Sequence, residues 1–127
     1  MSCWIIPCNT KNFNIIEHFV TNSEVVFKKD GLIKNGDYVY IYLAAPFKRI
    51  KYKCVVISTK VSDEELKQHQ YAVSPYSMRQ SYMKLKYEYT FETDQLTFDK
   101  LKKNGLGQVQ RQSRLDGKLL EFINSFK

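Results

Sequence analysis

The chain has 127 residues, of which 43% are hydrophobic and 14% aromatic, enough to bury the core of one domain. Its 20 lysines and arginines against 13 acidic residues give a formal charge of +7, which favours an anionic partner. The sequence contains no run of about 20 apolar residues, so it predicts no helix that spans a membrane.

The beginning of the chain and its cysteines favour the cytoplasm as the cellular compartment. Residues 1–7 are apolar, but they are too short for the core of a signal peptide and carry no basic leader, so we expect a cytoplasmic protein. The three cysteines are Cys3, Cys8 and Cys54, and their odd number without paired spacing predicts reduced, packed thiols. With only two histidines besides, the sequence predicts neither a metal site nor a cofactor.

Apolar and polar residues in the first half of the chain predict four strands and one helix. The strands cover residues 3–7, 25–27, 38–44 and 50–61, and the helix covers residues 13–20. Asn12 or Thr10 is expected to cap this helix. Its apolar stripe is formed by Phe13, Ile16, Phe19 and Val20.

The second half predicts one more strand and three short helices. Ser62 followed by acidic residues is typical of a helix start, and residues 70–80 are polar and irregular enough to predict a loop. A strand is expected over residues 82–91, with one face formed by Met83, Leu85, Tyr87, Tyr89 and Phe91. Thr97 is expected to cap a helix to about Lys103, and a last helix is expected over residues 113–125.

The strand over residues 38–44 has two different faces. Val39, Ile41 and Leu43 point to one side and can fill a core, while Tyr38, Tyr40 and Tyr42 point to the other. Aromatic rings beside basic residues suit a nucleotide base and its phosphate. The alternative is that the tyrosines pack beneath a helix, and the pattern alone leaves both interpretations open.

These elements predict a single domain over residues 1–127. Five to six strands joined mostly by short turns pair mostly antiparallel, and peripheral helices accompany them. The fold class is therefore α+β, with a twisted sheet that curls toward a barrel.

Four motifs follow one another along the chain in a specific order. They are WIIPCN at residues 4–9, GDYVYIY at residues 36–42, Ala45-Pro46, and GLGQVQR at residues 105–111 with Arg114-Leu115 behind it. In this order the chain resembles an EVE-type domain of the PUA-like superfamily. The resemblance implies a PUA-like pseudo-barrel with a pocket at one end that reads a modified or flipped base in DNA or RNA.

The resemblance also implies which residues form such a pocket. The matching positions are Trp4, Asn9, Tyr40, Tyr42, Ala44 and Pro46. Trp4 is the only tryptophan, so tyrosine or phenylalanine must complete any aromatic cage. Two alternatives remain open from the residues themselves: Trp4 as a core tryptophan, and Asn9 as a turn-forming asparagine.

Basic side chains near these motifs are candidate phosphate contacts. They are Lys34, Lys48, Arg49, Lys51, Arg79, Arg111 and Arg114. A solvated surface that only aids solubility is the alternative for each of them.

Three functions follow from these observations. The first is a module without catalytic activity that binds DNA or RNA and accepts an unstacked, modified base in an aromatic pocket. The second is a nucleoside- or nucleotide-directed hydrolase or nuclease of the kind credited to PUA-like relatives of the ASCH type, although spacing along the chain reveals no catalytic pairing. The third is a regulatory domain that takes a free nucleotide or another small molecule.

Overall fold

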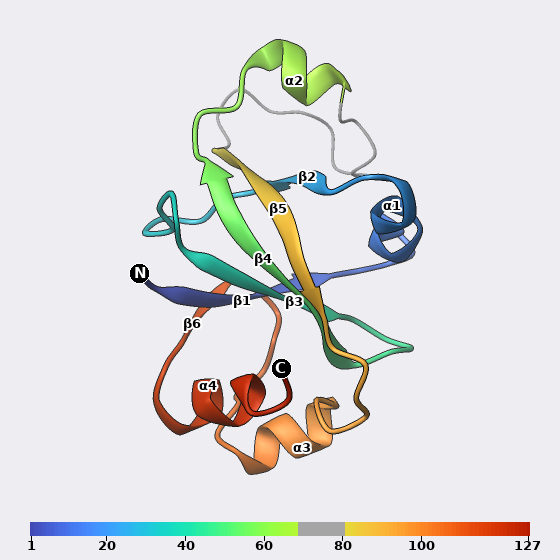
Figure 1. The fold of residues 1–127 in the computed structure, drawn as a ribbon, viewed down its shortest axis with the longest axis vertical. Helices are drawn as coiled ribbons and strands as arrows, with labels where there is room; N and C mark the ends of the chain where they lie inside the picture. Colours follow the sequence, from blue (N-terminus) through green and yellow to red (C-terminus); the bar gives the residue numbers. More distant parts are fainter. Residues whose placement is uncertain (69–80) are drawn as a thin grey trace.

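The chain folds around one curved sheet, as seen in a computed structural model that describes residues 1–68 and 81–127 (Figure 1). The loop predicted for residues 70–80 lies outside the described residues. The strands are β1 (Cys3–Cys8), β2 (Glu24–Lys28), β3 (Tyr38–Leu43), β4 (Arg49–Ser58), β5 (Tyr82–Thr90) and β6 (Ser113–Leu115). The helices are α1 (Ile15–Thr21), α2 (Asp63–Gln68), α3 (Phe98–Lys103) and α4 (Gly117–Asn124).

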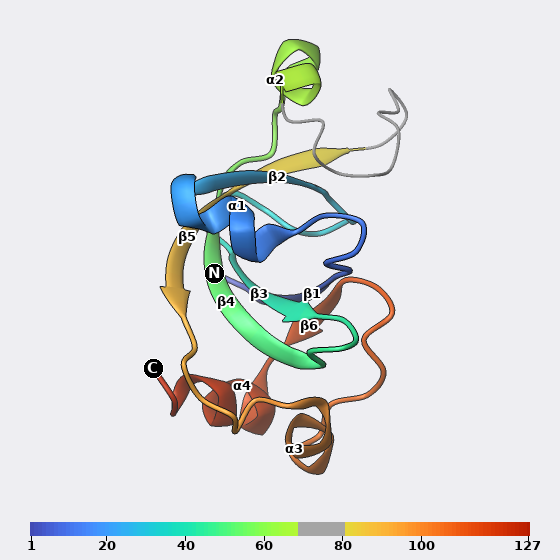
Figure 2. The same ribbon diagram turned by 90° about the vertical axis from the view of Figure 1, so that its right-hand side faces the viewer.

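The sheet has the strand order β2-β5-β4-β3-β1-β6. β1 and β3 run parallel, and the other neighbouring pairs are antiparallel. Figure 2 shows how strongly β4 and β5 bend, with α1 near one end of the bend and α3 and α4 beneath the other. The α+β fold class predicted from the sequence, with mostly antiparallel strands and peripheral helices, is confirmed.

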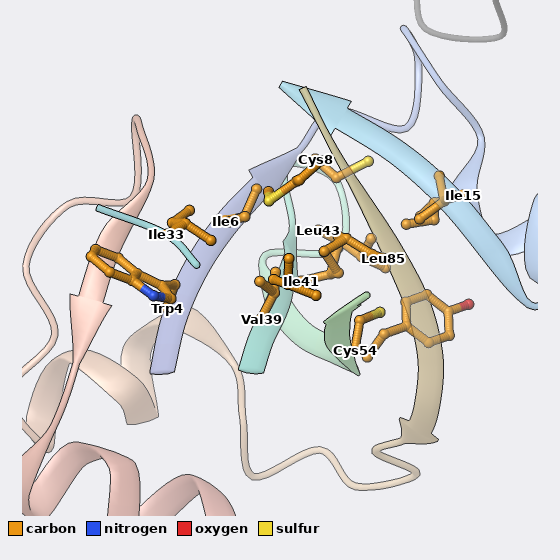
Figure 3. Close-up of a cluster of buried hydrophobic side chains, with 14 residues drawn as sticks. Trp4, Ile6, Cys8, Ile15, Ile33, Val39, Ile41, Leu43, Cys54 and Leu85 are labelled. Carbon is orange, nitrogen blue, oxygen red and sulfur yellow. The ribbon is translucent and has the colours of Figure 1, made fainter. Parts of the chain in front are cut away.

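The first hydrophobic core lies on the side of the sheet that α1 covers. Val39, Ile41 and Leu43 of β3 point into it, as the alternation of that strand predicts. Figure 3 shows these side chains between Trp4 and Ile6 of β1 and Leu85 of β5. The apolar face of β3 therefore joins strands from both halves of the chain.

The second hydrophobic core lies on the opposite side, between the sheet and the helices α3 and α4. Tyr40 is fully buried there and Tyr42 is 6% exposed. Leu101 of α3 and Ile123 of α4, both fully buried, pack in the same cluster. Tyr40 and Tyr42 therefore pack beneath helices, which was one of the two interpretations of the tyrosine face.

β5 changes the side to which its apolar residues point. Met83 and Leu85 lie in the first core, whereas Phe91 lies in the second. The prediction of one apolar face over residues 82–91 is therefore wrong. The cause is a β-bulge in the pairing of β4 with β5, because an extra residue in one strand shifts its alternation by one position.

The start of α1 also differs from the prediction. Asn14 is the N-cap, and its side-chain oxygen accepts a hydrogen bond from the backbone N–H of Glu17 (3.2 Å). The helix therefore begins two residues later than predicted, and its buried residue is Ile15. Val20, predicted in the apolar stripe, is 78% exposed, because it lies on a different side of the helix from Ile15.

The last predicted helix is divided between a strand and a helix. Residues 113–115 form β6, which pairs antiparallel with Cys3–Ile5, and α4 begins only at Gly117. Leu115 is still a core residue, but it enters the second core from a strand. The starts of α2 and α3 agree with the prediction. Ser62 Oγ accepts a hydrogen bond from the backbone N–H of Glu65 (3.2 Å) at the start of α2, and Thr97 is the N-cap residue of α3.

Candidate functional site

Four of the predicted base-pocket residues lie at two opposite ends of β1. Trp4 is near its beginning, whereas Asn9 directly follows its end. Ala44 lies close to Asn9, because the backbone N–H of Ala44 donates to the last carbonyl of β1 (2.9 Å), and Pro46 follows in the turn between β3 and β4. The amide oxygen of Asn9 accepts a hydrogen bond from the backbone of Lys11 (3.0 Å), as a turn-forming asparagine does.

The other two, Tyr40 and Tyr42, belong to the second core. The Tyr40 hydroxyl donates to the Asn124 side chain (2.6 Å), and its ring lies 6.2 Å from that of Phe91. The Tyr42 ring meets Phe98 of α3 edge to face, with centroids 6.4 Å apart. Burial raises the pKa of Tyr40 to about 12. The structure therefore distributes the six residues over three places.

Trp4 and the turn before β3 are held together by a buried carboxylate, Asp37, which is 5% exposed. Its two oxygens accept three hydrogen bonds, from the Trp4 indole N–H (3.0 Å) and from the backbone N–H groups of Ser2 (3.1 Å) and Lys34 (3.0 Å). Burial by itself raises the pKa of Asp37, but the three hydrogen bonds to the ionised form outweigh it and lower the pKa. Trp4 is thus a core residue with its N–H partner in place.

Asp37→Asn is expected to lower the free energy of unfolding by about 1–3 kcal/mol at pH 7, because hydrogen bonds to a charged acceptor are lost. A pKa lowered by folding contributes stability that is present above the unfolded pKa of about 4 and is lost as pH falls through the folded pKa. Urea unfolding at pH 7 and pH 3 measures both effects. The difference between the free energies of unfolding at pH 7 and pH 3 should be smaller in the variant than in the wild type. An unchanged difference would contradict this role of Asp37.

Two of the predicted phosphate contacts, Lys34 and Arg114, lie at the end of the sheet where β1 and β3 begin, and Arg111 lies beside a residue that contacts the β2–β3 loop. Arg114 donates from Nη2 to the Ser2 hydroxyl (3.3 Å), and Ser2 and Lys34 donate to the same buried carboxylate. Arg111 precedes Gln112, whose side chain binds the carbonyl of residue 28 (2.7 Å) and the N–H of residue 30 (2.9 Å) in the β2–β3 loop. Segments far apart in the sequence thus bring positive charge to one surface.

The other predicted phosphate contacts do not join this surface. Lys48, Arg49 and Lys51 lie at the turn between β3 and β4 and at the start of β4, where Pro46 lies as well. Lys51 forms an ion pair with Glu92 (3.8 Å). Arg79 lies outside the described residues.

One lysine of the basic residues around the start of β4 lies against tyrosines of the second core. Lys53 of β4 is only 7% exposed, and its ammonium group forms an ion pair with Glu88 Oε1 (3.5 Å). The same ammonium lies 4.1 Å from the centre of the Tyr38 ring and 5.8 Å from that of Tyr40. Lys127 Nζ approaches the same carboxylate oxygen (3.8 Å), and its pKa is lowered by the neighbouring Lys53.

The β-bulge in β5 explains why Glu88 reaches this lysine. The register pairs Lys53 with Tyr89 and Cys54 with Tyr87, so Glu88 is the additional residue between two ladder pairs. Bulges are frequent beside active sites because they redirect a side chain. Spacing along the sequence gives no sign that Lys53 and Glu88 pair, since they come from different strands. The available signal was the position of Lys53 within β4, on the side of the strand that faces the second core.

A pocket lies beside the β2–β3 loop at the basic end of the sheet. Its volume is about 510 Å³. It is lined by Lys29, Gly31, Leu32, Ile33, Lys34 and Asn35 of the loop, with Thr59 and Ser81. Lys34 therefore belongs both to the basic surface and to this pocket.

The cysteines are free thiols, as the sequence predicts. Burial raises the pKa of Cys3, Cys8 and Cys54, which makes thiolate formation unfavourable. Among residues 1–68 and 81–127, no three histidine, cysteine or acidic side chains are grouped so that they can hold a metal ion. No helix in that part of the chain is long and apolar enough to cross a membrane.

Comparison with protein-family profiles and with curated proteins gave no match. Solved structures do share the fold. The chain is similar to the ASCH protein of Zymomonas mobilis, with a TM-score of 0.65, 10% identity, and coverage of 98% of this chain and 94% of that one.

Two further structures show the same likeness. A structural-genomics protein of Pseudomonas putida has a TM-score of 0.71 at 12% identity, covering 98% of this chain and 99% of that one. A hypothetical protein of Leishmania major has a TM-score of 0.69 at 13% identity, covering 98% and 93%. These neighbours do not confirm the EVE type. What they show is the fold alone: the chain is a small α+β domain whose architecture is similar to that of the Zymomonas mobilis ASCH protein.

Proposed function

We propose that this chain is a nucleoside- or nucleotide-directed hydrolase of the ASCH type, with Lys53 and Glu88 as its reacting pair. The observation that carries the proposal is a nearly buried lysine paired with a carboxylate that is still 37% exposed. Glu88 is the member of the pair that a substrate can reach from solvent, and Lys127 Nζ lies 3.8 Å from the same carboxylate oxygen. Of the functions left open by the sequence, this one fits the ASCH neighbours better than an EVE-type base reader does.

The pair supplies the two groups that hydrolysis needs. Glu88 can accept a proton from a water molecule as the water oxygen bonds to an electrophilic carbonyl carbon or phosphorus. The Lys53 ammonium then stabilises the negative charge that develops on the substrate oxygen. When the bond to the leaving group breaks, Glu88 returns the proton to it, so the carboxylate is restored.

The surroundings of the pair suit a nucleotide substrate. The Lys53 ammonium lies 4.1 Å from the centre of the half-buried Tyr38 ring, so a base can stack only on the other face of this ring. Tyr38 lies four residues after Lys34, so the basic surface with Lys34 and Arg114 begins at the same end of the sheet. Phosphates held there can present the rest of a substrate to the pair.

The experiment is a hydrolysis assay with the purified full chain over acylated nucleosides, nucleotides and short single-stranded RNA. Wild-type protein is expected to hydrolyse at least one of these classes. Glu88→Gln should lower the rate about a hundredfold or more, because the general base is removed. Glu92→Gln is the matched control, since Glu92 forms a similar ion pair with Lys51 two residues along β4. Equal losses in both variants would refute the assignment.

A second candidate is binding of single-stranded RNA or DNA without catalysis. The presence of Lys34 and Arg114 at one end of the sheet favours it. A strand that contacts these cations releases counterions, so the logarithm of its affinity falls linearly with the logarithm of salt concentration. Salt-dependent binding by a wild-type protein that hydrolyses none of the substrates would favour this candidate over the hydrolase.

A further inference from the structure

We propose that the pocket beside the β2–β3 loop is a second site, separate from the reacting pair, that binds a phosphomonoester. The ligand is a free mononucleotide or the 5′-terminal phosphate of a strand, which present the same group. The pocket volume of about 510 Å³ lies in the range of small-molecule sites and has room for a nucleotide.

The lining of the pocket matches a phosphate group. Lys29 and Lys34 supply positive charge, while Asn35, Thr59 and Ser81 carry amide or hydroxyl groups, and none of the described lining residues is acidic. A phosphomonoester carries nearly two negative charges at pH 7 and three strong acceptor oxygens. Lysine is a common phosphate binder that acts as a point charge.

The two lysines retain capacity for a ligand. Lys29 Nζ donates one hydrogen bond to the carbonyl of Gly31 (2.9 Å), and an ammonium group has three protons to donate. Lys34 is exposed, and within the described part of the chain no ion pair holds its ammonium group. Binding therefore does not require an internal salt bridge to be broken.

The backbone of the loop is already held in place. Lys29 N–H donates to the Ser81 carbonyl (2.9 Å), which fixes the end of β2 beside the start of β5. Lys34 N–H donates to the buried Asp37 carboxylate (3.0 Å), and the Gln112 side chain holds the opposite flank of the loop. A site on a fixed backbone loses little conformational freedom when a ligand binds.

The rim of the pocket offers an apolar contact next to its charges. Leu32 is 73% exposed, whereas the next residue, Ile33, is 1% exposed and anchors the loop in the first core. An exposed leucine beside two lysines suits the ribose or base of a nucleotide whose phosphate is bound by the lysines. The pocket thus has separate places for the charged and the less polar part of one ligand.

Isothermal titration of the full chain with adenosine monophosphate tests this proposal, with adenosine as the ligand without phosphate. Lys34→Gln should weaken binding about tenfold, because a charged hydrogen bond is lost, and Thr59→Val should weaken it as well. Lys118→Gln removes an exposed lysine on α4 outside the pocket and should leave binding unchanged. Affinity should also fall from pH 7.5 to pH 5, because the phosphate gains a proton near pH 6.

Two short RNAs that differ only in a 5′-phosphate distinguish the sources of the phosphate. Equal affinity for the mononucleotide and the phosphorylated RNA indicates a free nucleotide, and tighter binding of the phosphorylated RNA indicates a strand terminus. Adenosine binding as tightly as its monophosphate would overturn the proposal. So would equal binding of the two RNAs, or equal losses in Lys34→Gln and Lys118→Gln. A wild-type protein that hydrolyses no substrate but binds adenosine monophosphate, and loses that binding in Lys34→Gln, would separate this site from the hydrolase proposal.

Discussion

Lys53→Met is expected to slow hydrolysis by about a hundredfold to a thousandfold while the protein stays folded. Removing one group that stabilises the developing oxyanion costs this much in other enzymes. Removing one partner of a buried ion pair usually destabilises a protein, because an unpaired charge is left behind. Here Lys127 Nζ remains 3.8 Å from the same Glu88 carboxylate oxygen, so the fold should survive. Glu88 is 37% exposed, so the carboxylate left behind can be solvated. Initial rates under saturating substrate, beside thermal unfolding of the same samples, measure both effects.

Lys51→Met provides the matched control for this variant. Lys51 lies two residues earlier on β4 and also forms an ion pair with a glutamate, but its side chain is 26% exposed and faces neither Tyr38 nor Glu88. The same chemical change there should leave the rate within about twofold of wild type, since exposed ion pairs contribute little. A rate lost equally in both variants would show that general charge, and not the reacting pair, drives the reaction.

Tyr40→Ala is expected to lower the free energy of unfolding by about 3–5 kcal/mol, as for other large aromatic side chains removed from a core. Tyr40 is fully buried, its ring stacks on Phe91, and its hydroxyl donates to Asn124 of α4. Its removal therefore leaves a cavity between the sheet and α4. Urea unfolding at neutral pH measures the loss.

Tyr40→Phe separates packing from hydrogen bonding in this position. The ring remains, so only the hydrogen bond to Asn124 is lost, and we expect a cost of about 1 kcal/mol. A Tyr40→Ala protein as stable as wild type that fails to bind nucleotides would contradict the core role. That result would restore the interpretation of this ring as a stacking surface for a base.

Local patterns predicted the fold class because each strand carries its own signal. The alternation in β3 separated Val39, Ile41 and Leu43 from the tyrosines, and both faces are found where that pattern places them. Residues 113–115 were misassigned for a reason outside their own sequence. They form a strand only because β1 offers a free edge to pair with, and no local pattern contains that information.

The candidate site was less accessible to sequence reasoning. Lys53 and Glu88 are 35 positions apart on neighbouring strands, and a bulge decides where Glu88 lies in the ladder. Lys34 and Arg114 are connected only indirectly, through Ser2 and the carboxylate of Asp37, which the sequence showed only as part of a turn motif. Predicting which side chains on different strands lie close together requires the register of the sheet. Composition and spacing show only which kinds of residue are present.

A double-mutant cycle on Lys53 and Glu88 tests the central claim most directly. If the two residues form one reacting pair, removing either destroys the same function, and their effects on the rate are strongly non-additive. The account predicts that the Lys53→Met, Glu88→Gln double variant hydrolyses its substrate no more slowly than the slower single variant. The account would be contradicted if the fold-loss in rate of the double variant equalled the product of the fold-losses of the two single variants.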